Sequence, residues 1–328
     1  MPRRGEDLSA VGLKHKEWYM MRRLGLTGIE TLPMLGLVLA MFVWGSSFLA
    51  LKIAFRGYDP MVAIWLRMVT ATGLFACGWK SLKNVVYTRG DWKFLIFMAL
   101  CEPCMYFIFE AYALTLTSAS QAGMITGILP LIVALMARFF LGEVVSGMTL
   151  IGFFLAIAGV TWLSLGGVAA PGAPRPVLGN FLELMAMCWG AGYTICLKKM
   201  SCRYPPLFLT AVQSVIGSVF FLFPVLLVPS VHLPHTFDPL ATLAIVYLGT
   251  VVTLGGYGLY NYGVSKLPAS RATAFTNLVP VFALILGWLV LGETLTVVQC
   301  WGALLVMAGV VVSQHFGQKK KNGLQSGS

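Results

Sequence analysis

The sequence predicts an all-α integral membrane protein, with ten transmembrane helices as two inverted five-helix repeats and both termini cytoplasmic. First, the 328 residues are 58% hydrophobic and 11% charged, with a mean hydropathy of +0.82, whereas a soluble domain has about 25% charged residues. Second, the stretch 119–160 recurs without a gap at 269–310. Third, Lys and Arg gather in alternate connections between apolar segments.

Ten apolar segments account for most of the chain, and each of roughly 18 to 25 residues is long enough to cross ~30 Å of hydrocarbon as a helix. Helices are expected because a span in lipid must satisfy its own backbone hydrogen bonds, and no segment alternates with period two. The segments run over 33–55, 60–79, 93–115, 118–139, 146–166, 178–199, 206–228, 240–263, 268–290 and 295–315.

The distribution of positive charge predicts the orientation. If the N-terminus is cytoplasmic, the inside loops and tails hold 19 Lys and Arg residues, the outside connections hold 3, and Arg67 lies within a span. This is the bias of the positive-inside rule, so the net charge of +11 reflects membrane orientation and not nucleic-acid binding. The polar, basic start of the chain does not resemble a cleavable signal peptide.

The repeat predicts the domain organisation. Each half has an odd number of spans, so the second half enters the membrane from the opposite side, as in many secondary transporters with a midplane site. The alternative is a duplication that serves packing alone. The predicted parts are a cytoplasmic basic tail (1–32), a first repeat (33–166), an extracytoplasmic Pro/Gly linker (167–177), a second repeat (178–315) and a cytoplasmic basic tail (316–328).

Short motifs in both halves resemble the EamA family of the drug/metabolite transporter superfamily. In the first half they are WGSSF at 44–48, Asp59-Pro60 followed by Arg67, the stretch 113–120, Pro130 and LGE at 141–143; in the second half they are 189–190, 267–270, Pro280 and LGE at 291–293. The resemblance covers about 33–315 and implies a ten-helix carrier of small metabolites or amino acids, often directed outward. The halves differ at Arg67, whose aligned position holds Gln213.

Arg67 and Glu102 are charged residues within predicted spans, where such groups are rare and usually functional. At ~1.5 Å per residue, both lie near the bilayer midplane, where they could pair directly or through water. A fixed structural ion pair is one interpretation. The other is a counter-ion that substrate or a proton displaces, which makes proton antiport through Glu102 a hypothesis.

Glu110 and Tyr106 extend this polar feature, since both share roughly one helix face with Glu102. Such a stripe suits a cavity wall that attracts an amine or a cation, although solvation of Glu110 at the rim and packing of Tyr106 would also explain it. Pro103 interrupts the helix beside Glu102 and frees a carbonyl, which must find a partner in another helix or a cavity. Pro130 and Pro280 interrupt the repeated helix, and the three prolines are candidate hinges or packing kinks.

Further polar and aromatic residues are candidates for the substrate path. Trp44 and Trp189 are symmetry partners that could instead belong to an interfacial aromatic belt. Glu143 and Glu293 of the LGE motifs are expected at helix starts in a structural role. The other path candidates are Gln121, Tyr193, Tyr257, Tyr260, Asn261 and Asn277.

The sequence gives little support for an enzyme, a metal site or a cofactor. Cys101 and Cys104 form a lone CxxC pair, and His232, His235 and Asp238 are interpreted as solvated loop residues. Neither a nucleotide-binding loop nor a nucleophile motif is present. We therefore expect a secondary carrier in the cell inner (plasma) membrane, a monomer or homodimer that contacts membrane lipid and a small-molecule substrate. The alternatives are a proton-independent uniporter or exchanger, a non-transporting sensor or assembly subunit, and an intramembrane enzyme.

Overall fold

The computed structural model describes residues 28–78, 85–143, 145–167, 169–170, 172–234 and 236–325, and it is helical almost throughout. Residues 1–27 of the predicted N-terminal tail, together with Lys80, Lys83, Pro171 and His235, lie outside the described residues. The rest of that predicted tail, 28–32, is helical, so the first helix begins earlier than the sequence predicts. Apart from a bridge between Ala170 and Ala173, the described ranges contain no β-structure.

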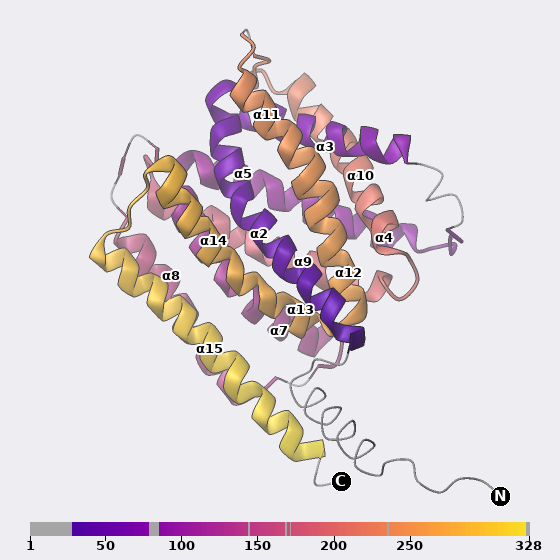
Figure 1. Ribbon diagram of the computed structural model, residues 1–328, viewed down its shortest axis with the longest axis vertical. Helices are drawn as coiled ribbons and strands as arrows, with labels where there is room; N and C mark the ends of the chain where they lie inside the picture. Colours follow the sequence, from indigo (N-terminus) through magenta and orange to yellow (C-terminus); the bar gives the residue numbers. More distant parts are fainter. Residues whose placement is uncertain are drawn as a thin grey trace, which may run out of the picture.

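The first half folds into five helical paths (Figure 1). They are α2 (Gly28–Gly57); α3 (Pro60–Cys77); α4 (Trp92–Ala99), η2 (Leu100–Met105) and α5 (Tyr106–Leu116); α6 (Ala119–Ile125), η3 (Thr126–Ile128) and α7 (Leu129–Phe140); and α8 (Gly147–Leu165).

The second half repeats this order of five paths. They are α9 (Pro176–Met200); α10 (Pro206–Leu227); α11 (Pro239–Tyr247), η4 (Leu248–Tyr257) and α12 (Gly258–Lys266); α13 (Ala269–Ala274), η5 (Phe275–Asn277), α14 (Leu278–Leu286) and η6 (Gly287–Leu291); and α15 (Val297–Gln325). The last helix therefore continues beyond residue 315, where the sequence predicts a tail to begin.

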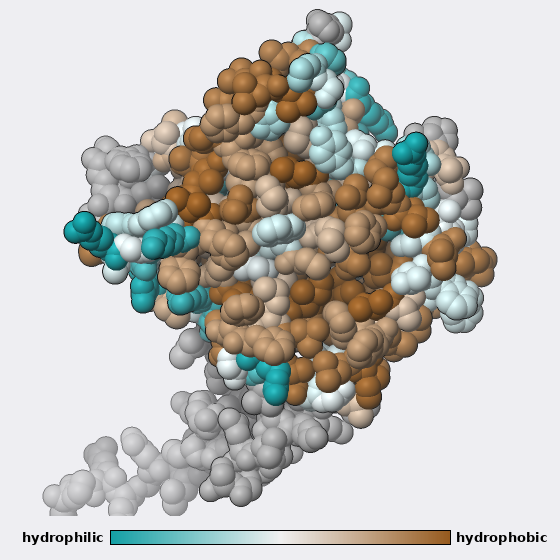
Figure 2. Space-filling model, turned by 180° about the vertical axis from the view of Figure 1, so that it is seen from behind, coloured by the Kyte–Doolittle hydropathy of each residue, from teal (hydrophilic) through white to brown (hydrophobic). Residues whose placement is uncertain are grey.

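Eight of these paths are long and apolar enough to cross a membrane. The other two are α9, which carries Asn180, Glu183 and two lysines among its 25 residues, and the last helix, whose apolar part is Val297–Ser313. Figure 2 shows one face largely covered by hydrophobic residues, with hydrophilic ones mainly toward its margins. Exposed Phe154, Trp288 and Leu304 contribute to such an apolar exterior. The chain is a multi-pass membrane protein, while the count of ten spans stays a prediction.

Local sequence explains where several helices begin. The carboxylate of Asp59 accepts a hydrogen bond of 2.8 Å from the Met61 amide at the start of α3. Asp238 accepts hydrogen bonds from the amides of Leu240 and Ala241 at the start of α11. Each of these aspartates precedes a proline at the first helical position, where the missing N–H costs nothing.

The two halves are joined most closely where α8 runs beside α15 (Figure 1). A Cβ atom added at Gly159 would lie 2.6 Å from the Val306 amide nitrogen and 2.8 Å from the Gly302 carbonyl oxygen. The two backbones therefore approach more closely than any larger residue permits, as in other small-residue helix contacts in membranes.

The LGE motifs also join the halves. Gly142 and Gly292 have φ angles of 70° and 68°, a left-handed conformation that glycine adopts at low cost when it ends a helix. The glutamate after Gly292 then accepts hydrogen bonds of 2.9 and 2.8 Å from the amides of Ala119 and Ser120, at the start of α6.

The equivalent Glu143 contacts the equivalent Ser270 in α13, whose hydroxyl donates a 2.5 Å hydrogen bond. Glu293 thus caps a helix start, as the sequence predicts, but that helix belongs to the opposite half. Each carboxyl group joins the end of one repeated helix to the start of its counterpart.

Candidate functional site

The helical path α4–η2–α5 changes direction at Glu102. This residue has an extended backbone (φ −150°, ψ 116°) between helical neighbours. Pro103 follows and has no N–H to donate. The extended backbone takes the Glu102 carbonyl out of the helical hydrogen-bond pattern, and this carbonyl accepts a 2.8 Å hydrogen bond from Nε2 of Gln213 in α10.

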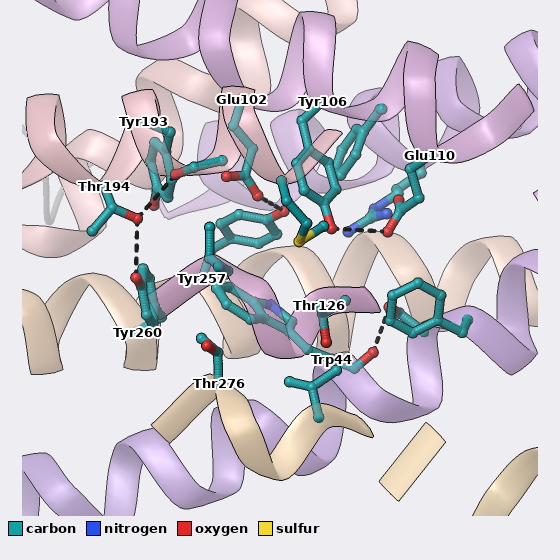
Figure 3. Close-up of a pocket in the computed structure, with 18 residues that line it drawn as sticks. Trp44, Glu102, Tyr106, Glu110, Thr126, Tyr193, Thr194, Tyr257, Tyr260 and Thr276 are labelled. Atoms are coloured by element: carbon teal, nitrogen blue, oxygen red, sulfur yellow. Dashed lines mark hydrogen bonds between the residues drawn. The ribbon is translucent and has the colours of Figure 1, made fainter. Parts of the chain in front are cut away.

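A buried cavity of about 40 Å³ lies beside this break and is lined by both halves (Figure 3). A water molecule needs roughly 10–15 Å³ by this measure, so the cavity has room for a few water molecules in this conformation. Its lining consists of Trp44, Ser47, Phe48, Arg67, Glu102, Tyr106, Phe107, Glu110, Thr126, Leu129, Met187, Gly190, Tyr193, Thr194, Tyr257, Tyr260, Thr276 and Val279.

The Glu102 end of the cavity is held by residues of the second half. The Glu102 side chain is 5% exposed, and its carboxylate accepts a hydrogen bond from the Tyr257 hydroxyl (Figure 3). The Tyr257 ring in turn packs against Trp44, with ring centroids 5.1 Å apart. The carboxylate of Glu102 therefore has a hydroxyl donor that is fixed by aromatic packing.

The Glu110 end has fewer polar partners. The hydroxyl of Tyr106 donates a 3.2 Å hydrogen bond to Glu110 Oε1 (Figure 3). Glu110 is 3% exposed, and its Oε2 has no hydrogen-bond partner among the described residues. Tyr106 and Glu110 thus lie together on the cavity wall, as the spacing predicts.

Arg67 reaches the same cavity from α3 and is 2% exposed. Its Nε donates a 2.9 Å hydrogen bond to Thr253 Oγ1, and its guanidinium carbon lies 4.2 Å from the centre of the Phe107 ring. Arg67 is near enough to interact electrostatically with both Glu110 and Glu102, but its Nη1 lacks a hydrogen-bond partner in the described structure.

The direct pair of Arg67 with Glu102 considered from the sequence is not formed. The salt bridge found within the described ranges joins Arg203 and Asp91 at 2.6 Å. Arg67 and Glu102 line one cavity, but each is hydrogen-bonded to a neutral residue of the second half.

Tyrosines and threonines complete the wall. Tyr193 donates to the Asn261 side chain, and the hydroxyls of Thr194 and Tyr260 are 3.1 Å apart (Figure 3). Thr126 and its repeat partner Thr276 both line the cavity, so the internal symmetry places equivalent hydroxyl groups at one site. Asn261 lies behind this lining and supports Tyr193.

Several other candidates do not line this cavity. Trp189 packs against the core, while its neighbour Gly190 faces the cavity. Asn277 donates a 2.7 Å hydrogen bond to the Ala274 carbonyl in its own helix. Pro103 lines a small adjoining pocket. Pro130 and Pro280 are buried near the starts of α7 and α14, directly after the short η3 and η5 turns.

Gln121 lies at a second, wider pocket of about 750 Å³, which we call the vestibule. It is lined by charged and polar residues where the end of α2 meets the start of α6 and the turn before α15; these include Lys52, Arg56, Ser118, Gln121, Glu293 and Gln299. The amide oxygen of Gln121 accepts a 3.0 Å hydrogen bond from the side chain of Asn180.

Glu183 is a buried residue that the sequence analysis did not single out. It is 0% exposed, and neither carboxyl oxygen has a hydrogen-bond partner among the described residues. A lone carboxylate within an otherwise apolar stretch is the signal that identified Glu102, and it could have identified Glu183 as well.

Comparisons with known proteins agree with this architecture. The model of the EamA-like transporter family matches residues 31–165 and 178–313. A relative from Bacillus subtilis (strain 168), named "Uncharacterized transporter YcxC", is 31% identical over 304 residues, covering 89% of this chain and 95% of the relative. An Escherichia coli (strain K12) relative named "Probable amino-acid metabolite efflux pump" is 27% identical, covering 89% and 97% respectively.

A solved crystal structure has the same fold. It superposes with a TM-score of 0.63 at 19% identity and covers 87% of this chain and 98% of the other. These family and relative names indicate a transporter and not an enzyme.

Proposed function

This chain belongs to the EamA-like transporter family, and we propose that it is a secondary carrier that exports small zwitterionic metabolites such as amino acids. It spans the inner (plasma) membrane ten times as two inverted five-helix units, 33–166 and 178–315, with both termini in the cytoplasm. The start of α2 and the end of α15 lie toward the same end of the molecule (Figure 1), which supports this topology.

One observation carries the choice of substrate. Three buried polar atoms of cavity-lining residues lack a hydrogen-bond partner within the described structure: Trp44 Nε1, Arg67 Nη1 and Glu110 Oε2. The first two are donors and the third is an acceptor. Leaving such groups unsatisfied costs free energy, so buried polar atoms normally have partners.

A zwitterion supplies the missing partners. Its carboxylate can accept from Arg67 and Trp44, and its ammonium group can donate to Glu110. The Trp44 ring lies 5.1 Å from the Tyr257 ring and 4.7 Å from the Tyr260 ring, measured between centroids. The faces of these aromatic rings also attract an ammonium group.

Transport requires the cavity to open, because about 40 Å³ is too small for an amino acid. The break at Glu102 and the repeated turns before Pro130 and Pro280 are the points at which the helices can bend. We propose that bending there opens the cavity to each side in turn, which is the alternating access that inverted halves permit.

Export is favoured by the name of the Escherichia coli relative, an amino-acid metabolite efflux pump. Coupling to protons would use a carboxyl group of the cavity, and Glu102 is the candidate from the sequence. One alternative function is a carrier that exchanges substrates without moving protons. Another is a membrane sensor that binds the substrate without transporting it.

Flux through the purified protein tests the proposal. Reconstituted vesicles loaded with a mixture of radiolabelled proteinogenic L-amino acids should release label faster than protein-free vesicles. Arg67→Gln should slow this release by roughly 10- to 100-fold, since a hydrogen bond to a charged group contributes about 1.5–3 kcal/mol.

Arg175→Gln is the matched control, because Arg175 is exposed before α9 and lies away from the cavity. Its release rate should equal that of the wild type. Binding of amino acids without any release would favour the sensor and overturn the carrier.

A further inference from the structure

Glu183 has no part in the substrate site, yet it is more completely buried than Glu102, Glu110 or Arg67. It does not line the cavity. A charged carboxylate in such a place is costly unless it is paired or can exchange a proton.

The packing of α9 against α5 places Glu183 behind Glu110. A Cβ atom on Gly179 would lie 2.9 Å from the Ala113 carbonyl oxygen, and one on Gly190 would lie 3.3 Å from the Tyr106 ring. These contacts run antiparallel along one face of α9. Glu183 lies between the two glycines on that face, so it meets α5 at the level of Glu110, with which it interacts electrostatically.

Two further charged groups surround this carboxyl pair. Arg67 of α3 interacts electrostatically with Glu110, and Glu102, farther along the cavity, also interacts with Glu110. Glu110 is the charged neighbour that acts on Glu183 itself. Two neighbouring buried carboxylates are not both charged at low cost, so the pair is suited to share one proton.

Polar side chains connect the pair to the vestibule. Gln121, which lines the vestibule, accepts from Asn180, and Asn180 Oδ1 accepts a 2.7 Å hydrogen bond from Thr117. Asn180 also donates a 3.1 Å hydrogen bond to Ser164. Glu183 follows Asn180 by three residues on α9, about one helical turn deeper. The hydrogen-bonded polar groups thus lead from the vestibule to Asn180, one turn from Glu183 on the same helix.

We propose that Glu183 and Glu110 form the proton-transfer site of the carrier, in place of Glu102, whose carboxylate already accepts from Tyr257. Glu183 receives protons from the vestibule, which opens to the extracytoplasmic side in the proposed topology, and Glu110 exchanges them with substrate. This rests on the proposed function. Glu183 in its acid form gives its proton to Glu110 Oε2, so an O–H bond breaks at Glu183 and one forms at Glu110. The substrate ammonium group dissociates, and the protonated Glu110 no longer binds it again. Glu183 takes a new proton from water that enters from the vestibule past Asn180.

The cycle closes when the cavity opens to the cytoplasm. Glu110 then loses its proton to water there, and its carboxylate binds the next ammonium group. One proton moves inward for each substrate molecule that moves outward.

Two assays on reconstituted vesicles separate proton transfer from substrate binding. Exchange of radiolabelled for unlabelled L-amino-acid mixture at equal pH needs no net proton movement. Accumulation driven by a pH gradient needs it. Glu183→Gln should retain exchange and lose gradient-driven accumulation by roughly tenfold or more, whereas Glu183→Asp keeps a carboxyl group and should restore much of it.

Glu143→Gln is the matched control, since Glu143 joins the halves at Ser270 and is outside this route. It should accumulate amino acids as the wild type does. Gradient-driven accumulation by Glu183→Gln at the wild-type rate would overturn the proton-transfer site. Wild-type exchange without any response to the gradient would also overturn it while leaving the carrier intact, and no wild-type flux at all would instead reject the proposed function.

If Glu183→Gln loses exchange as well, chemical modification of the wild-type protein tests the proton-transfer site. Dicyclohexylcarbodiimide attacks protonated carboxyl groups in apolar surroundings. The proposal expects modification of Glu183 or Glu110 that decreases as pH rises, and peptide mass mapping that finds neither residue modified at any pH would overturn it.

Discussion

Glu102 and Glu110 lie eight residues apart on one helical path and are similarly buried, yet their surroundings differ. Glu102 receives a hydrogen bond from Tyr257 at its side chain and from Gln213 at its carbonyl, both from the second half. Glu110 is bonded by Tyr106 of its own helix and keeps one oxygen unpartnered. Because the two residues are similarly buried, the number of hydrogen-bond partners distinguishes them, and we expect Glu110 to bind substrate and Glu102 to hold the helices together.

The largest expected effect follows from replacing Glu110. Glu110→Gln removes the charge that should hold the substrate ammonium group, so we expect amino-acid flux in vesicles to fall by roughly 10- to 100-fold. Glu102→Gln should alter flux less, because a glutamine oxygen can still accept from Tyr257. A greater loss of flux in Glu102→Gln than in Glu110→Gln would reverse the comparison.

The second prediction concerns stability and the Glu102 end. Tyr257→Phe leaves the buried Glu102 carboxylate without its hydroxyl donor, which should cost about 1–3 kcal/mol in the free energy of unfolding. A lower melting temperature of the detergent-purified protein would show it. Tyr106→Phe is the matched comparison at the Glu110 end, and we expect a smaller decrease there, because the bond is longer and one Glu110 oxygen is already unpartnered. Equal decreases would contradict the difference between the two ends.

The smallest effect is expected far from both carboxyl groups. Glu293→Gln leaves one oxygen to accept from the amides of Ala119 and Ser120 and removes the charge, and such weakening of a helix cap costs at most about 0.5–2 kcal/mol. The melting temperature should fall slightly, while the ratio of flux at two pH values should match the wild type. A change in that ratio would mean that the vestibule carboxyl group belongs to the proton route.

The repeat and the composition were sufficient to predict an all-helical membrane protein of this family. Helical spacing also predicted that Tyr106 and Glu110 would share one face with Glu102, and all three line the cavity. The rotation of each helix about its axis was harder to predict. Trp189 and Gly190 are adjacent, so a rotation of about 100° decides which of them faces the cavity, and Gly190 does.

The hydrogen-bond partners of the buried polar side chains were also hard to predict from the sequence. The sequence offered Arg67 as the partner of Glu102, but the backbone at Glu102 leaves the helical conformation and turns its carboxylate to Tyr257. Gln121 is directed to Asn180, and the position of Glu183 depends on how α9 packs against α5. These contacts join residues far apart in the chain, which periodicity within one segment cannot reveal.

Competition for transport tests the central claim most directly, that Arg67 and Trp44 bind a carboxylate while Glu110 binds an ammonium group. The measurement is release of radiolabelled L-amino acids by wild-type vesicles in the presence of excess unlabelled amino acids, their methyl esters or their N-acetyl forms. We predict that the free amino acids compete strongly and that both derivatives compete weakly, since each lacks one charge. Equal competition by either derivative would contradict the zwitterion site.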